Sequence, residues 1–104
     1  MELKSIIFCL NSETRRRILQ LLSKRDMSAP QIFEELGTHA PKYRQSINKT
    51  LETMRNCGLV AKYYDNEKRG IYYHLIAKSI ILEIDKLKVG PFEAQKRQED
   101  RVKL

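Results

Sequence analysis

Apolar residues recur at helical spacing through the first quarter of the chain. One helix face is predicted near the N-terminus by the i, i+3, i+4, i+7 spacing of Leu3, Ile6, Ile7 and Leu10. A second helix is predicted to begin after Asn11 or Ser12, either of which can cap it, and to end near Lys24. Its inner face is formed by Thr14, Ile18, Leu21 and Leu22.

Three consecutive arginines lie on this second helix. Arg15, Arg16 and Arg17 span about 200° of its surface at the helical period, so they cannot all point the same way. We expect at least one to lie beside the core and to pair or snorkel there. The others are expected to reach phosphates or a partner subunit.

A third helix is marked at both ends. Ser28 and Gln31 have the S-x-x-Q spacing of a capping box, in which each side chain satisfies the other residue's unpaired backbone donor. Gly37 is suited to the C-cap, and Met27 is placed for a very short strand before the helix. The predicted inward face is Ile32, Phe33 and Leu36.

Residues 42–56 form a further predicted helix with two different faces. A helical wheel at about 100° per residue groups four apolar side chains, Tyr43, Ile47, Leu51 and Met54, as a buried stripe. The opposite face is polar and basic: Lys42, Gln45, Ser46, Lys49, Thr53 and Asn56, with Asn48 on its flank. These amide, hydroxyl and ammonium groups suit base edges and phosphates in a DNA major groove. The alternative interpretation is an ordinary solvated helix face.

After Gly58 the pattern changes to that of strands. Residues 59–65 and 70–77 are rich in β-branched and aromatic residues and flank a charged turn, Asn66–Arg69, which predicts a β-hairpin. Alternation places Leu59, Tyr73 and Leu75 toward the core and Tyr72 and His74 on the other side. Helix, turn and helix followed by a hairpin predict a winged helix-turn-helix, with its wing at residues 65–70.

The helical period returns after Lys78. A helix over residues 78–90 is predicted from the apolar stripe Ile80, Ile81, Ile84 and Leu87. With Leu3, Ile6, Ile7 and Leu10 at the other terminus, this stripe is expected to form a homodimer interface, and the alternative is that both terminal helices fold back on their own core. The predicted fold class is therefore mainly α with a small β-hairpin (α+β), a winged helix-turn-helix with extra N- and C-terminal helices. Residues 1–90 form this domain, and 91–104 form a charged C-terminal extension of undecided structure.

Charge favours a polyanionic partner. The 104 residues carry a net charge of +7, and basic domains tend to bind nucleic acid. The segment 42–55 has four basic side chains and one acidic, which places part of the excess on the predicted groove-binding helix. Charge of this kind also serves solubility, so it strengthens the nucleic-acid interpretation only modestly.

Several other classes of protein are not indicated. No apolar run approaches the roughly 18 residues of a membrane span, no secretory cleavage pattern opens the chain, and a cytoplasmic protein is expected. Neither a phosphate-binding glycine loop nor a nucleophile-base-acid arrangement is present, so we expect no enzymatic activity. Cys9 and Cys57 are 48 residues apart without metal-ligand spacing, and they are expected to be small buried thiols rather than a disulfide or zinc site.

Four segments together resemble a known family. NSETRRRILQLL, MSAPQIFEELG, SINKTLETMRNCGLV and GIYYHLIA, in this order and spacing, are similar to the ArsR-type winged-helix transcription regulators over about residues 8–77. The resemblance implies a homodimer built through terminal helices, recognition helices in successive major grooves, and repression at an inverted repeat. The family's serine-arginine-histidine segment falls on Asn48, Lys49 and Thr50, where this chain departs from the pattern.

Metal sensing is not expected from this chain. The resemblance implies metal ligands either as a cysteine pair in the helix before the recognition helix or as histidine and acidic residues in the last helix. Residues 31–36 contain no cysteine and 77–88 contain no histidine. A transition-metal site needs two or three convergent ligands, so no metal or cofactor is predicted, and the sequence does not name another effector.

The sequence thus predicts a sequence-specific regulator of transcription that binds double-stranded DNA as a homodimer. Predicted phosphate contacts are Lys42, Arg44, Arg55, Lys68 and Arg69, and predicted base contacts are Gln45, Ser46, Asn48 and Lys49. The alternative is a winged-helix module that binds proteins within a transcription or replication complex. RNA binding ranks third, because few aromatic residues are placed for stacking.

Overall fold

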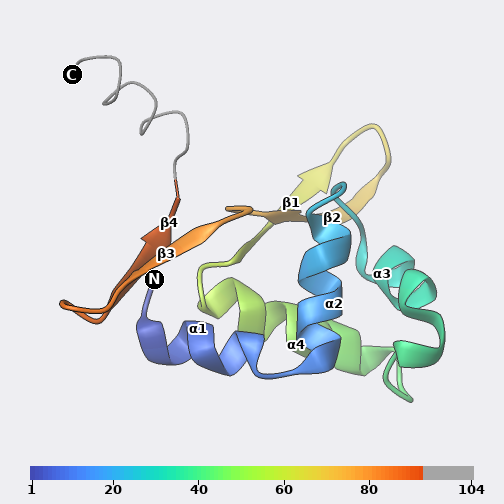
Figure 1. Cartoon of the computed structure of the whole chain (residues 1–104). Coiled ribbons are helices and arrows are strands. Elements are labelled where there is room, and N and C mark those ends of the chain that lie inside the picture. Colours follow the sequence, from blue (N-terminus) through green and yellow to red (C-terminus); the bar gives the residue numbers. More distant parts are fainter. Residues whose placement is uncertain (93–104) are drawn as a thin grey trace.

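The computed structural model describes residues 1–92. Its helices are α1 (Leu3–Leu10), α2 (Glu13–Leu22), α3 (Ala29–Leu36), the 3-10 turn η1 (Gly37–His39) and α4 (Gln45–Asn56). The strands β1 (Val60–Asp65) and β2 (Gly70–Leu75) form one antiparallel hairpin, and β3 (Ile80–Glu83) and β4 (Lys88–Pro91) form a second. In Figure 1 the helices lie together, and the two hairpins extend toward opposite ends of the molecule.

The helices and the first hairpin share one apolar core. Each α-helix contributes at least two buried side chains: Ile6, Cys9, Ile18, Leu22, Ile32, Leu36, Ile47, Leu51 and Met54. Tyr73 of β2 joins this core, and its backbone exchanges two hydrogen bonds with Met27, at 2.8 and 3.2 Å. The predicted short strand at Met27 is therefore confirmed as a bridge between β2 and the start of α3. This arrangement confirms the winged helix-turn-helix fold.

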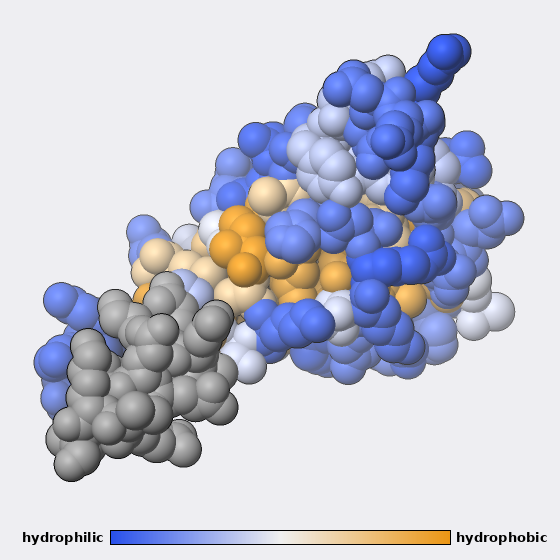
Figure 2. Space-filling model, turned by 90° about the horizontal axis from the view of Figure 1, so that it is seen from above, coloured by the Kyte–Doolittle hydropathy of each residue, from blue (hydrophilic) through white to orange (hydrophobic). Residues whose placement is uncertain are grey.

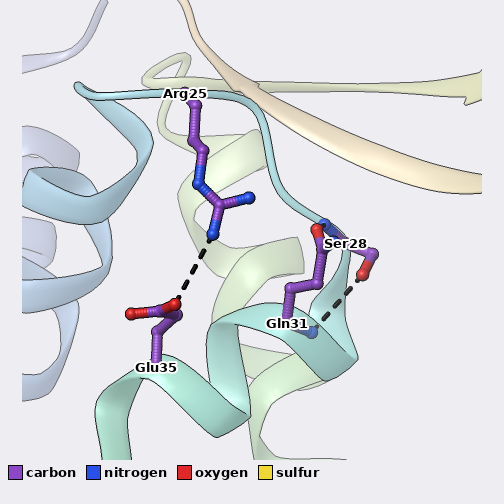
Figure 3. A network of polar contacts seen from close by, with 4 residues as sticks. All are labelled: Arg25, Ser28, Gln31 and Glu35. Atoms are coloured by element: carbon purple, nitrogen blue, oxygen red, sulfur yellow. Dashed lines mark hydrogen bonds and ion pairs between the residues drawn. The ribbon is translucent and has the colours of Figure 1, made fainter.

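The start of α3 follows its sequence signature. Ser28 Oγ accepts a hydrogen bond from the backbone N–H of Gln31, and Gln31 Oε1 accepts one from the backbone N–H of Ser28, at 3.4 and 3.0 Å. Figure 3 shows this capping box beside the ion pair of Arg25 with Glu35, whose closest N–O distance is 3.5 Å. Gly37 ends the helix with a φ of 55°, a left-handed value that favours glycine.

The arginines of α2 bond to their own chain. Arg15 Nη2 donates to the carbonyl of Phe8 at 3.0 Å, and Arg16 Nη1 donates to the carbonyl of Leu10 at 2.6 Å. These carbonyls lie at the end of α1, where helix geometry leaves acceptors unpaired and favours positive charge. Arg17 pairs with Glu13 one turn earlier, and this hydrogen bond lowers the pKa of Glu13.

The predicted helix over residues 78–90 is wrong. The segment forms the β3–β4 hairpin, in which Leu82 pairs with Val89 and Glu83 with Lys88. Consecutive β-branched residues at Ile80 and Ile81 suit a strand, and the chain reverses at 84–87, where Leu87 takes a left-handed φ of 49°. The apolar spacing that predicted a helix is thus divided between a strand and a turn. Ile80, Ile81, Ile84 and Leu87 do not share one helix face.

The cysteine prediction is also corrected. Cys9 and Cys57 are buried as expected, but they are joined in a disulfide. Their separation of 48 residues gives no signal of this pairing, because it depends on α1 packing near the end of α4. Most of the predicted charged extension, 93–104, lies outside the described residues. No helix in the part that is described has the length and apolar composition to cross a membrane.

Candidate nucleic-acid interface

Helix α4 has one buried face and one exposed polar face. Ile47, Leu51 and Met54 are each fully buried, which confirms three members of the predicted apolar stripe. Gln45, Asn48 and Lys49 are exposed, and Ser46 is half-buried. The residues predicted to read base edges therefore lie on the side of α4 that is open in the described chain.

The start of α4 differs from the prediction. The helix begins at Gln45, so Lys42, Tyr43 and Arg44 belong to the turn before it. Tyr43 is 61% exposed and is not part of the buried stripe. The reason is local: no capping side chain is available at the start, and Arg44 occupies the N-cap position without a side-chain hydrogen bond. The Arg44 guanidinium lies 5.5 Å from the centre of the Phe33 ring, a cation–π contact that joins this turn to α3.

Ion pairs and backbone bonds occupy some polar groups of α4. The hydroxyls of Thr50 and Thr53 donate to backbone carbonyls one turn earlier, at 2.9 and 3.1 Å. Glu52 pairs with Arg55 at 2.5 Å and approaches Lys62 of β1 at 3.9 Å. Among the predicted phosphate contacts, Arg55 therefore already has an acidic partner within its own helix.

The wing is a short charged turn between β1 and β2. Asp65 Oδ1 accepts hydrogen bonds from the backbone N–H groups of Glu67 and Lys68, both at 2.9 Å. Arg69 takes a left-handed φ of 54° directly before Gly70. The Lys68 ammonium lies 4.9 Å from the centre of the Tyr72 ring. Both predicted wing cations are exposed, and the register places Asp65 opposite Gly70, as the predicted boundaries require.

A polar cluster anchors the wing hairpin to the helices. Asp26, in the connection between α2 and α3, accepts from the Tyr63 hydroxyl at 2.6 Å and lies 2.7 Å from His74 Nδ1. Tyr63 lies on β1 and His74 on β2, so one carboxylate holds both strands. Partial burial acts to raise the pKa of Asp26, but the hydrogen bonds from Tyr63 and His74 outweigh it and lower the pKa. The same hydrogen bond to Asp26 raises the pKa of Tyr63 to about 12.

Comparison with known proteins finds similarity to one family. Residues 12–62 match the model described as bacterial regulatory protein, arsR family. An ArsR-like transcriptional regulator from Rhodococcus sp. RHA1 is 36% identical, and the match covers 71% of this chain with a TM-score of 0.56. A possible transcriptional regulator for arsenical resistance is 29% identical over 66% of this chain, with a TM-score of 0.55. The chain is similar to ArsR-family winged-helix regulators.

The similarity of this ArsR-like chain to its relatives is partial. It spans 64% of the length of the Rhodococcus protein and 66% of the second structure. The ferric uptake regulator of Vibrio cholerae is 16% identical over 86% of this chain and 75% of its own, with a TM-score of 0.52, which shows a shared fold alone. No curated protein sequence matches the chain.

The described part of this ArsR-like chain shows no group of possible metal ligands. Within residues 1–92, no three side chains of His, Cys, Asp or Glu lie together in a way that could hold a metal ion. The expectation that the protein senses no metal stays a prediction.

Two features of this ArsR-like protein escaped the sequence reasoning. The anchor of Asp26 with Tyr63 and His74 joins residues 37 and 48 positions apart. Alternation did place His74 on the face away from the core, but it gave no indication of the acidic partner. The Cys9–Cys57 disulfide had no sequence signal at all.

Proposed function

We propose that this chain is a sequence-specific regulator of transcription, most consistent with a repressor, which binds double-stranded DNA as a homodimer. The observation that carries the proposal is the exposed polar face of α4 above a fully buried apolar stripe. ArsR-family similarity over residues 12–62 supports it, because this segment includes α2, α3 and α4.

In the proposed complex α4 lies in the major groove. Gln45, Ser46, Asn48 and Lys49 meet base edges with amide, hydroxyl and ammonium groups. Phosphate contacts come from Lys42 and Arg44 before the helix and from Lys68 and Arg69 in the wing, which lies on the flanking backbone or minor groove. Arg55 contributes least, since Glu52 already pairs with it.

The proposed dimer surface consists of exposed apolar side chains near both ends of the described chain. Ile7 and Leu10 of α1, with Ile81, Ile84 and Leu87 of the second hairpin, are exposed. Figure 2 shows that apolar residues also reach the surface on the face seen there, between hydrophilic residues. Ile6 leaves the predicted set because it is 2% exposed and packs in the chain's own core. Leu3 and Ile80 are only partly exposed and form the inner margin of the surface.

A dimer gives a geometric condition for the DNA target. Two recognition helices must be about 34 Å apart to enter successive major grooves on one side of the duplex. A two-fold dimer then selects an inverted repeat. Selection of bound fragments from random duplex DNA is the direct test, and we expect a palindromic consensus.

Substitutions separate the roles of base and phosphate contacts. Lys49→Ala or Gln45→Ala should weaken binding to the selected duplex by about 1–3 kcal/mol and relax its sequence preference. Lys68→Ala should weaken binding to all duplexes alike and reduce the salt slope by about one unit. Fluorescence anisotropy on the selected and random duplexes, over a range of salt concentrations, measures both effects.

The matched control is Lys86→Ala. Lys86 lies in the turn of the second hairpin, at the far end of the molecule from the wing (Figure 1), and pairs with Glu83 at 3.4 Å. Lys86→Ala removes the same charge outside the proposed DNA contacts, but in the turn that carries Ile84 and Leu87 of the proposed dimer surface. Sedimentation should therefore show first that the variant has the same mass as the parent, and its affinity should then stay close to that of the parent. Equal losses on selected and random DNA for both the base-contact and the phosphate-contact variants would contradict the assignment. If the chain binds other proteins but no DNA, the alternative of a protein-binding winged-helix module is favoured instead.

A further inference from the structure

The Cys9–Cys57 disulfide joins two elements with different proposed roles. Cys9 lies on α1, which carries part of the proposed dimer surface, and Cys57 is the C-cap residue of α4, the proposed recognition helix. The backbone N–H of Cys57 donates to Thr53 at 3.1 Å, which fixes the cysteine to the last turn of α4. A single covalent bond therefore connects the dimer surface to the helix that reads DNA.

Besides the packing of Ile6 and Cys9 in the shared core, α1 has few contacts that hold it against α4. It is 8 residues long and has no side-chain hydrogen bond at its N-cap, Glu2. Helices of this length are marginal by themselves and depend on tertiary contacts. The arginine bonds described above attach the end of α1 to α2 rather than to α4. Residues 12–62, which match the family, include Cys57 but not Cys9, so the bond ties a segment outside the match to one inside it.

The two cysteine residues differ in access to solvent. Cys9 is fully buried, whereas Cys57 is 6% exposed and lines an open cleft of about 420 Å³ with Lys4, Ser5, Phe8, Thr53 and Asn56. An attacking thiolate can therefore approach Cys57 and not Cys9. The Cys57 sulfur also lies 3.2 Å from the carbonyl oxygen of Ser5, an acceptor for the thiol proton after reduction. After reduction, the buried Cys57 thiol therefore still has a hydrogen-bond partner, the carbonyl of Ser5.

We propose that this bond is a reversible redox lock on DNA binding: the disulfide form holds α1 and α4 in the binding arrangement, and reduction releases it. The inference rests on the proposed function, because it describes the regulation of the same surface. Cellular compartments that contain DNA generally keep thiols reduced, and disulfides found there are usually transient or redox-sensing. The lock therefore changes state with the supply of small-molecule thiols and disulfides.

The chemistry is thiol–disulfide exchange. A thiolate of a small dithiol attacks the Cys57 sulfur, the bond to Cys9 breaks, and Cys9 leaves as a thiolate that takes up a proton. The second thiol of the reductant then attacks the mixed disulfide and releases Cys57, which also becomes a thiol. The protein gains two electrons and two protons, and the reductant becomes a cyclic disulfide. Oxidation by a small-molecule disulfide is the reverse exchange, with release of two small thiols.

The experiment compares the full chain after treatment with dithiothreitol and after treatment with glutathione disulfide. Titration should find both cysteines free in the first sample and neither in the second. Affinity for the selected palindromic duplex, measured without carry-over of reagent, should be lower in the reduced form by about 5- to 150-fold, the usual range of coupling between two sites. Hydrogen exchange at the amides of α1 should be faster in the reduced form.

A redox-inert variant controls for effects of the reagents. The double substitution Cys9→Ser with Cys57→Ser should bind like the reduced protein and show no response to either reagent. Circular dichroism checks that the double variant is folded. If it is not, the comparison of the reduced and oxidised parent chain still tests the lock. Free thiols after glutathione disulfide, or equal affinity and equal α1 exchange in both forms, would overturn the lock. If neither form binds DNA, the proposed function fails. Thiol titration and hydrogen exchange at α1 then still decide whether reduction of the disulfide releases α1.

Discussion

Replacing Asp26 by Asn should loosen the wing hairpin from the helices. Asp26→Asn keeps the size of the side chain but removes the charge that the Tyr63 hydroxyl and His74 share. Hydrogen bonds to charged groups contribute about 1.5–3 kcal/mol each where they are buried. The side chains of His74 and Asp26 are 54% and 33% exposed, so solvent screening reduces the expected total loss to about 1–2 kcal/mol. For a domain of this size that corresponds to a fall in Tm of about 5–15 °C.

The assay is thermal unfolding followed by circular dichroism across a range of pH. The lowered pKa of Asp26 means that its contribution is fully present above the ordinary range of a carboxyl group and is lost as the pH falls through the lowered value. The difference in Tm between the parent and Asp26→Asn should therefore be complete at neutral pH and should vanish in acid. Because the pKa of Tyr63 is raised to about 12, its hydrogen bond persists through neutral pH and is lost as the pH rises through that value.

Tyr63→Phe is the matched control for this prediction. It removes one of the two partners of Asp26 and should cost less than Asp26→Asn. In the double variant the effects should not add, because the two residues share one interaction. Equal Tm values for the parent and Asp26→Asn at neutral pH, or a difference that persists in strong acid, would refute the anchor.

Three further predictions concern the core, a helix cap and assembly. Leu51→Ala, at a fully buried position on α4, should reduce the free energy of unfolding by about 2–5 kcal/mol in urea titrations, whereas exposed Lys49→Ala should change it by less than about 0.5 kcal/mol. Ser28→Ala removes the capping box of α3 and should cost about 1 kcal/mol in the same titrations; no change would show that the cap is dispensable. Ile84 is 70% exposed, so Ile84→Glu should leave a folded monomer in sedimentation. Lys86→Gln is the control for the same turn and should stay dimeric. A dimeric mass for Ile84→Glu would show that this turn is not part of the dimer interface.

Local signals in the sequence were sufficient for the central fold. The capping box at Ser28, the glycine at position 37 and the change from helical to alternating period after Gly58 each act within a few residues, and each reappears in the structure. The turn from Asn66 to Arg69 was predicted for the same reason, since it lies between two segments of clear strand composition. Burial of Ile47 and Leu51 followed from their period alone.

The errors arose where one pattern permits two structures or where distant residues decide. The apolar spacing of Ile80, Ile81, Ile84 and Leu87 satisfies a helix, yet β-branched residues and a reversal at 84–87 favour a hairpin. Sequence period also placed Tyr43 on the buried face, but it could not reveal that α4 lacks a side-chain cap and begins at Gln45, three residues after the predicted start. The disulfide and the Asp26 anchor depend on contacts across most of the chain, which periodicity does not report.

Two of the three consecutive arginines are occupied at the end of α1, and this limits how the protein's charge acts on DNA. A protein displaces condensed counterions only with those cations that reach the phosphates, and each such contact adds about 0.9 to the salt slope. The guanidinium groups of Arg15 and Arg16 already bond to the carbonyls of Phe8 and Leu10. Counterion release will therefore report fewer cations than the 20 basic side chains of the sequence suggest.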